Sequence, residues 1–154
     1  MTQPSLFGEP HGGAATANID GGSRGNPGPA GFGVRIQRDD GTIVELKAPL
    51  EMATNNVAEY RGLLAALEWA AREGVRSLDV RSDSELLVKQ MRGEYRVKNP
   101  GLQPLFEEAR RLARQVGRVR FEHVRRELNK DADRLANEAM DEAAGGKGGD
   151  GGNG

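Results

Sequence analysis

The spacing of apolar residues changes along this chain from every second residue to every third or fourth, and this change restricts the fold most. Phe32, Val34 and Ile36 alternate with polar or small residues, which is the pattern of a half-buried strand. A short strand before them, a turn at 39–41 and a returning strand at 42–46 predict an antiparallel meander. From residue 56 onward the spacing becomes helical. The chain is therefore expected to begin as a small sheet and to continue with helices.

The later segments alternate between helix and strand. The expected helices are 56–72, 84–91, 102–116 and one that starts near 131, and the expected later strands are 78–83 and 119–124. Crossover connections make such later strands parallel to the first strand. The order β-β-β-α-β-α-α-β-α thus predicts an α/β fold, with a five-stranded mixed sheet (an antiparallel meander plus two parallel strands) flanked by helices.

Glycine and cysteine usage bounds the folded domain and excludes some chemistry. The 154 residues contain no cysteine, which excludes disulfides, thiolate metal sites and cysteine nucleophiles. Seven of the 22 glycines lie in the last ten residues. We expect a flexible segment at 1–13, one folded domain at 14–144 and a disordered Gly-rich tail at 145–154. Because no signal peptide and no long apolar run is evident, we expect a cytoplasmic protein without a membrane partner.

The formal net charge of −1 conceals three blocks of opposite sign. Residues 1–88 carry 8 Lys/Arg and 12 Asp/Glu (net −4), residues 89–126 carry 11 and 4 (net +7), and residues 127–154 carry 3 and 7 (net −4). The basic block is either the solvated face of the helix expected at 102–116 or a surface for an anionic partner. The net charge alone therefore does not exclude nucleic acid.

Five acidic residues lie where predicted elements begin or end. Asp20 ends the first strand, Glu59 lies near the start of the first long helix, Asp83 ends a later strand, and Asp131 and Asp133 open the last helix. Sites in mixed α/β sheets gather at such positions. Carboxylates brought together repel one another unless a cation lies between them, and oxygen ligands favour Mg²⁺ or Mn²⁺. Helix capping and the helix dipole are the simpler explanation for each acid taken alone.

The helical position of Glu59 weakens that local explanation. A capping box with Asn56 is one interpretation, and Ser82 with Glu85 forms a similar pair in the next helix. At about 100° per residue, however, Glu59 lies roughly 200° from Arg61 on the solvated face. It falls beside the core, on the line of Leu63, Ala66 and Ala70. A carboxylate there needs a partner, and a metal ion is one candidate.

Six glycines lie between residues 20 and 33, around the turn sequence GNPG at 25–28. A plain turn is the default interpretation. The segment is not a P-loop, because no Gly-Lys-Ser/Thr follows it. Backbone exposed by glycine beside Asn26 would also let a sugar-phosphate chain approach closely.

Four segments together resemble the signatures of type 1 ribonuclease H, in order and at that family's spacing. They are DGGSRGNPGPAG (20–31), TNNVAEY (54–60), SDSELLV (82–88) and NKDADRLAN (129–137). The resemblance covers roughly residues 15–142 and is to the bacterial and archaeal branch that lacks the basic protrusion. It implies the ribonuclease H-like fold, which the predicted element order also fits.

This resemblance implies an endoribonuclease that hydrolyses the RNA strand of RNA–DNA hybrids by a two-metal-ion mechanism, leaving 5′-phosphate and 3′-hydroxyl ends. The catalytic, metal-binding carboxylates implied by position are Asp20, Glu59, Asp83 and Asp133. The implied cofactor is two Mg²⁺ ions, with Mn²⁺ as a substitute. Asp133 is preferred to Asp131 because the family's acid directly precedes x-Leu-Ala.

The resemblance also implies the substrate contacts. Asn26, Asn55 and Asn56 match polar contacts with the RNA strand. Contacts of this kind do not read base identity, so cleavage is expected to be largely independent of sequence. Some members of the short-loop branch also attack double-stranded RNA, which leaves that substrate open. We expect a monomer.

Two departures from the family pattern change the expectations. Many members carry a histidine on the loop before the last helix, whereas His123 falls in a predicted strand, where a structural role is the simpler interpretation. An arginine of the loop 125–128, or Glu127, is then expected to take over part of that role. The missing protrusion leaves hybrid binding to other cations, which include Lys89, Arg92, Arg96 and Lys98.

Two functions of other classes stay open. Loss of one of the four acids would favour a non-catalytic hybrid-binding module, and all four are present. A different nuclease or strand-transfer enzyme on the same fold would be expected to carry three acids and another order of helices.

Overall fold

The computed structural model describes residues 13–145, and its elements follow the predicted order with one added 3-10 turn. The strands are β1 (Ala14–Ser23), β2 (Gly28–Arg38), β3 (Ile43–Ala53), β4 (Ser77–Ser82) and β5 (Arg118–His123). The helices are α1 (Asn55–Arg72), α2 (Glu85–Met91), α3 (Gln103–Val116) and α4 (Lys130–Gly145), and the turn is η2 (Arg126–Leu128). The predicted segments 1–13 and 145–154 lie outside the described residues, apart from Gly13 and Gly145. No helix in the described range is long and apolar enough to cross a membrane.

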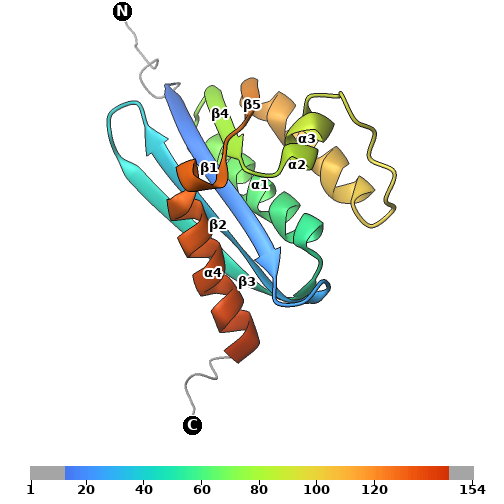
Figure 1. Ribbon diagram of the computed structural model, residues 1–154. Coiled ribbons are helices and arrows are strands. Elements are labelled where there is room, and N and C mark those ends of the chain that lie inside the picture. The colour runs from blue at the N-terminus through green and yellow to red at the C-terminus, as the bar shows by residue number, and fades with distance from the viewer. Residues whose placement is uncertain (1–12, 146–154) are drawn as a thin grey trace, which may run out of the picture.

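The five strands form one mixed sheet in the order β3-β2-β1-β4-β5 (Figure 1). β2 pairs antiparallel with both β1 and β3, which makes the predicted meander. β4 is parallel to both β1 and β5, as crossover connections through helices require. The predicted α/β fold with a five-stranded mixed sheet is confirmed.

The meander strands are longer than predicted. β1 continues past residue 20, β2 starts before residue 32, and β3 runs past residue 46. Gly21 and Gly22 keep pairing with β2 although they contribute no side chain to an alternating pattern. β3 is an edge strand whose side chains are only exposed or half-buried, so apolar residues mark its course weakly. Periodicity therefore locates these strands but underestimates their length.

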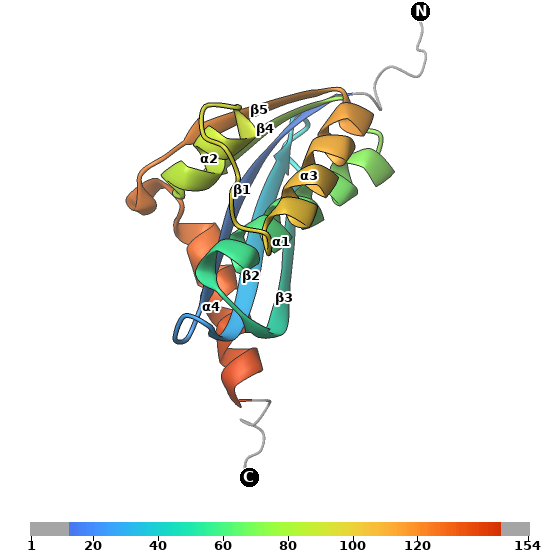
Figure 2. The same cartoon turned by 90° about the vertical axis from the view of Figure 1, so that its right-hand side faces the viewer.

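Helices cover both faces of the sheet. Figure 2 shows α1 and α3 on one side of it and α4 on the other. Ala15, Ala17 and Ile19 of β1 are buried in the core that α1 covers, and residues of the other parity face α4. This alternation places Asp20 on the face toward α4.

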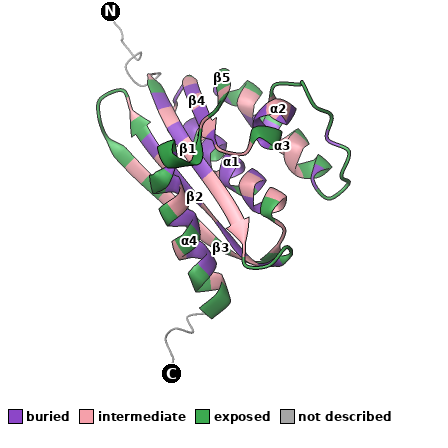
Figure 3. Ribbon diagram, in the orientation of Figure 1, coloured by how far each residue is buried: buried purple, intermediate pink, exposed green. Residues whose placement is uncertain are grey.

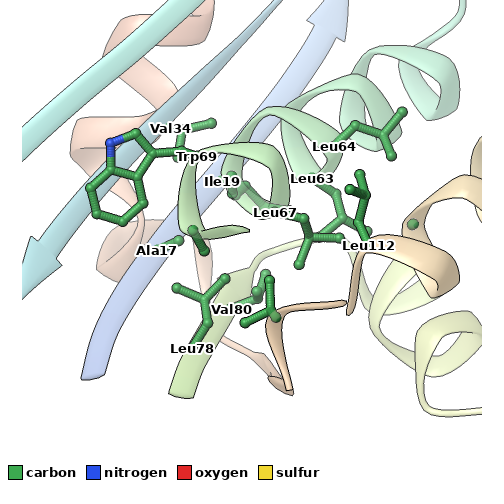
Figure 4. Packing of buried hydrophobic residues seen from close by; sticks show 14 of the residues in the cluster. Ala17, Ile19, Val34, Leu63, Leu64, Leu67, Trp69, Leu78, Val80 and Leu112 are labelled. Atoms are coloured by element: carbon green, nitrogen blue, oxygen red, sulfur yellow. The ribbon is translucent and has the colours of Figure 1, made fainter. Parts of the chain in front are cut away.

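The main core lies between the sheet and α1, with α3 packed against α1 (Figure 4). Leu63 and Leu67 of α1 and Leu78 and Val80 of β4 are fully buried there. Each side chain of this kind contributes about 1.5–3 kcal/mol when it is removed from water. Figure 3 shows the buried residues concentrated where sheet and helices meet. This core holds β1, β4 and the start of α1 in fixed relative positions.

Thr54 and Ser84 cap the two helices that begin closest to the strand ends. Each hydroxyl accepts a hydrogen bond from the backbone N–H three residues later, at 3.2 Å. The two capping boxes considered from the sequence are therefore wrong, because neither Asn56 nor Ser82 is the N-cap residue. Local capping consequently does not explain the position of Glu59.

Candidate active site

Four acidic side chains from different parts of the chain line one cleft at the end of β1. The cleft has a volume of about 510 Å³. Its acidic residues are Asp20, Glu59, Asp83 and Asp133. Arg24 and Arg126 also line it. The structure thus brings together the four carboxylates that the resemblance implies, and their role as metal ligands stays a prediction.

The parallel pairing of β1 and β4 places two of these acids side by side. Ile19 and Ser82 form the last pair between β1 and β4, and they directly precede Asp20 and Asp83. Glu59 comes from the second turn of α1. Asp133 comes from the first turn of α4, on the other face of the sheet. The cleft therefore lies where helices from both faces of the sheet approach the carboxyl ends of β1 and β4.

Burial and mutual repulsion change the acidity of two of these groups. Burial raises the pKa of Asp20 to about 8, and the charge of Asp83 and a hydrogen bond with Asp133 add to the rise. Burial also raises the pKa of Glu59 to about 7, opposed by a hydrogen bond with Ser84 and assisted by the charge of Asp83. The cleft therefore favours uptake of protons or cations near neutral pH.

The donor set suits a hard divalent cation. Carboxylate oxygens are ligands that Mg²⁺ and Mn²⁺ prefer. The raised pKa of Asp20, caused by burial and by its acidic neighbours Asp83 and Asp133, shows that a proton or a cation is needed to offset the charge here. As the side chains stand, no three His, Asp or Glu residues within 13–145 converge on one ion position. A bound ion would have to draw the carboxylates closer together.

The structure separates the two acids that open α4. Asp133 lines the cleft. Asp131 is exposed and forms ion pairs with Arg35 at 3.4 Å and with Arg134 at 3.8 Å. Its position agrees with a helix-start residue rather than with a member of the acidic cluster.

Asn26 and Asn55 fasten the Gly-rich turn to the start of α1. The Asn55 N–H donates to Asn26 Oδ1 at 3.0 Å, and the Ser23 N–H donates to Asn55 Oδ1 at 2.8 Å. These bonds engage the side-chain oxygens, while the Nδ2 groups donate to no group among the described residues. Asn55 lines the cleft, and Asn56 is half-buried next to it on α1.

The loop before α4 places one arginine in the cleft. His123 is the last residue of β5, as its predicted strand requires, and is exposed outside the cleft lining. Arg126 lines the cleft. Glu127 instead pairs with Arg125 at 3.4 Å. Of the two candidates to replace the loop histidine, the structure thus brings only an arginine to the acids.

Asn129 connects the two layers beside the cleft, and the sequence interpretation missed it. Its side chain is 1% exposed and donates from Nδ2 to the backbone oxygen of Ile19 at 2.9 Å. Its Oδ1 accepts a hydrogen bond from Asn18 at 2.9 Å, and its backbone oxygen accepts one from the Asp133 N–H at 3.0 Å. Asn129 thereby holds the start of α4 against β1. A single polar residue has no periodicity, so only its place in the fourth segment could have indicated this role.

The four cations expected to hold the hybrid differ in their engagement. Lys89 pairs with an acid of its own helix at 3.0 Å, and Arg92 donates to a backbone oxygen of β5 at 2.9 Å. Arg96 and Lys98 are exposed and form no ion pair within the described range. They lie between α2 and α3, where the chain forms no additional helix. Of these four cations, Arg96 and Lys98 are the most available to a polyanion.

The chain is similar to known proteins over most of its length. Residues 18–139 match the family described as reverse transcriptase-like. The bifunctional protein Rv2228c of Mycobacterium tuberculosis is 51% identical over 127 residues, so the match spans 81% of this chain but only 35% of that protein. The N-terminal RNase H domain of Rv2228c, solved as a fusion with maltose binding protein, aligns with a TM-score of 0.84 and 47% identity, over 88% of this chain and 99% of that chain.

Two further relatives show the same similarity. Ribonuclease HI of Halobacterium salinarum is 44% identical over 133 residues, which are 86% of this chain and 67% of that protein. The structure of LC11-RNase H1 in complex with an RNA/DNA hybrid aligns with a TM-score of 0.79 and 43% identity, over 84% of this chain and 99% of that chain. The fold implied by the four sequence segments is therefore the fold of these solved structures.

Proposed function

This chain belongs to the reverse transcriptase-like family as a ribonuclease H-like domain, and from that membership we propose that it is an endoribonuclease acting on RNA–DNA hybrids. It would hydrolyse the RNA strand largely independently of sequence and leave 5′-phosphate and 3′-hydroxyl ends. The observation that carries the proposal is the cleft that four carboxylates line. A module that only binds hybrids has no use for acids that repel both one another and the substrate.

We infer that Asp20, Glu59, Asp83 and Asp133 hold two Mg²⁺ ions, with Mn²⁺ as a substitute. When bound, the ions would supply the Lewis acidity that activates water and stabilises the leaving 3′-oxygen. The residues themselves would present oxygen ligands from rigid elements. Asp20 and Glu59 would release protons as they bind metal, because the pKa of each is raised.

Polar and basic residues outside the acidic cluster would bind the two strands. The Nδ2 groups of Asn26 and Asn55, with Asn56 beside them, are suited to sugar and phosphate oxygens of the RNA strand. Arg96 and Lys98 would contact phosphates of the DNA strand. The LC11-RNase H1 structure contains an RNA/DNA hybrid, which supports this substrate class for a similar domain.

Arg126 is the residue that we assign to the role of the family's loop histidine. It lines the cleft, whereas Glu127 is paired outside it. A guanidinium remains charged at any pH at which the protein is folded, so it cannot exchange a proton as a histidine does. Its part would be to stabilise and release the phosphate product.

Cleavage of a labelled RNA–DNA hybrid with Mg²⁺ or Mn²⁺ tests the proposal. We expect Asp20→Asn and Asp83→Asn each to lower the rate by at least about 100-fold, because each removes a charged ligand. Glu51→Gln, at an exposed acid of the edge strand β3, is the control and should cleave normally. Full activity in both cleft variants would overturn the site, and binding without cleavage by the unmodified chain would favour a hybrid-binding module.

The same assay defines the substrate range. Single-stranded RNA, double-stranded DNA and double-stranded RNA of the same sequence should be compared with the hybrid. Cleavage of double-stranded RNA would extend the proposal to that duplex, and cleavage of DNA would contradict it.

A monomer in the cytoplasm is part of the same proposal, and light scattering of the purified chain measures its mass.

A further inference from the structure

Arg24 is one of two arginines that line the acidic cleft, and its guanidinium is held from one side only. Its Nη2 atom lies 2.8 Å from Asp141 Oδ1 and within 3.3 Å of two oxygens of Asn137, all on α4. The Nε and Nη1 groups donate to no group among residues 13–145. Three N–H groups of a permanently charged, planar donor are therefore available at the cleft.

The backbone on both sides of Arg24 is also held in place. The Arg24 N–H donates to the Pro29 oxygen at 2.8 Å. The adjacent Ser23 N–H is bound by Asn55, and Asn26 is bound by the start of α1. The guanidinium therefore has an anchor at its Nη2 end and another at its backbone, which lowers the entropy lost when a ligand binds.

The charge of the cleft explains why a cation is useful there. If the proposed function holds, four carboxylates and two divalent ions cancel each other. A phosphodiester then adds one negative charge, and the transition state of its hydrolysis carries about two. An arginine that lines this cleft can neutralise part of that charge, and its unpaired Nε or Nη1 group can donate a charge-assisted hydrogen bond to a phosphate oxygen.

We propose that Arg24 binds a phosphate of the RNA strand at the cleft, as a substrate-binding residue in addition to the asparagines. The inference rests on the proposed function. The simpler role for Arg24 is that of a strap that ties the Gly-rich turn to α4 through Asp141. The two roles differ in one respect: only a phosphate contact contributes to the salt dependence of substrate binding.

Fluorescence anisotropy with a labelled hybrid, in an Asp20→Asn background that does not cleave it, separates the two roles. We expect Arg24→Ala to weaken binding about tenfold and to reduce the slope of log affinity against log salt by about 0.7–0.9. Arg24→Lys should retain most of the slope. Asp141→Ala breaks the strap at a side chain that is 68% exposed and should leave the slope unchanged.

Steady-state cleavage by chains that are otherwise unmodified gives a second readout. Arg24→Ala should raise KM about tenfold more than Asp141→Ala does. Equal losses in both variants with an unchanged salt slope would overturn the inference and leave Arg24 as a strap. Such equal losses would leave the proposed function intact, provided that the unmodified chain cleaves hybrids. A chain that neither cleaves nor binds hybrids would overturn the proposed function itself.

Discussion

α1 and α4 pack on opposite faces of the same sheet with opposite kinds of residue. α1 contributes large apolar side chains such as Leu67 to the core (Figure 4). α4 instead lies against glycines of β2. A Cβ atom added at Gly33 would lie 2.5 Å from Leu135 Cβ, and one added at Gly31 would lie 2.6 Å from Ala139 Cβ. The α1 face is filled by side-chain volume, whereas the α4 face is closed by the direct approach of the helix to the strand.

This difference explains how acids from two faces reach one cleft. Gly33 pairs with Asp20 in the β1–β2 ladder, so the glycine that admits α4 lies beside the acid that Asp133 meets. α1 makes the same approach at Gly21, where an added Cβ would lie 2.6 Å from the Glu59 nitrogen. Gly21 and Gly33 therefore lie where a helix delivers a carboxylate, and large side chains occur where the packing provides stability.

The largest effect is expected at the acid that α4 delivers. Asp133→Asn should lower the rate of hybrid cleavage by at least about 100-fold, because a charged ligand is lost from the cleft. Asp131→Asn, two residues away, should change it by less than about threefold, since exposed ion pairs contribute little. Parallel assays of the two purified variants measure this, and the opposite ranking would show that the wrong acid has been assigned to the metal site.

Gly33→Val should show how far cleavage depends on the close approach of α4 to the sheet, apart from any loss of stability. The added side chain collides with Leu135 and with the backbone of α4, so we expect a loss of about 1–3 kcal/mol in the free energy of unfolding. We also expect a roughly 30-fold loss of cleavage, because α4 must move away from β1. Denaturant unfolding and cleavage assays of the same preparation measure both.

Leu67→Ala is the matched control on the α1 face. It should cost about 2–5 kcal/mol of stability, at least as much as Gly33→Val. The molecules that remain folded should cleave within about threefold of the unmodified rate, because no carboxylate is displaced. Equal losses of activity in the two variants would contradict the division between the faces.

The element order was predictable because it depends on local patterns, and the set of four acids was predictable because four segments resemble the signatures of type 1 ribonuclease H. Alternation and helical spacing locate the strands and helices, and the helical angle of Glu59 is sufficient to place it beside the core. The parallel arrangement of two strands then brings Asp20 and Asp83 to the same edge. The periodicity and the helical angle need only the chain around each residue, and the parallel pairing follows from the rule for crossover connections.

The closure of the cleft was not predictable in the same way, because it depends on contacts between distant segments. Gly31 and Gly33 fit the small positions of an alternating pattern, and nothing in that pattern indicates that a helix more than 90 residues later lies against them. Asn129 and Arg24 lie in polar stretches without a periodic pattern, and their partners are known only from the fold. The predicted N-cap residues were wrong for a simpler reason. Several hydroxyl and amide side chains precede each helix, and spacing alone does not show which of them is the cap.

Asn129→Ala should have an intermediate effect, since it loosens the connection between the layers without removing a ligand. The substitution leaves the Ile19 oxygen and the Asn18 amide without their partner, at a cost of about 2 kcal/mol. We expect about tenfold slower cleavage and a higher Mg²⁺ concentration for half-maximal rate, because Asp133 is held less firmly. Asn18→Ala, which removes only one of these bonds, should show a smaller change of both quantities. A normal Mg²⁺ dependence in Asn129→Ala would show that this residue acts on stability alone.

The smallest effect expected is a gain of stability in the metal-free protein when Asp20 is neutralised. The pKa of Asp20 is about 8 in the folded chain against 3.8 for an ordinary aspartate, so the folded state holds its proton more tightly than the unfolded state. The stability that this proton provides is complete below about pH 4 and is lost as the pH rises toward 8. The free energy of unfolding of Asp20→Asn should therefore exceed that of the unmodified chain by about 1–2 kcal/mol at pH 8 and should equal it near pH 4. The value at pH 8 is smaller than the full pKa shift implies, because water in the open cleft screens the charge.

Urea unfolding in chelator at both pH values measures this difference, and repeating it with Mg²⁺ relates it to the site. Added Mg²⁺ should stabilise the unmodified chain more at pH 8 than at pH 4, because metal and protons compete for the same carboxylates. Asp20→Asn should gain less from Mg²⁺ at either pH. Identical stabilities of the two chains at pH 4 and pH 8 would show that Asp20 is not strained by its neighbours. The approach of α1 and α4 to β1 would then bring their acids together without raising the energy of the fold.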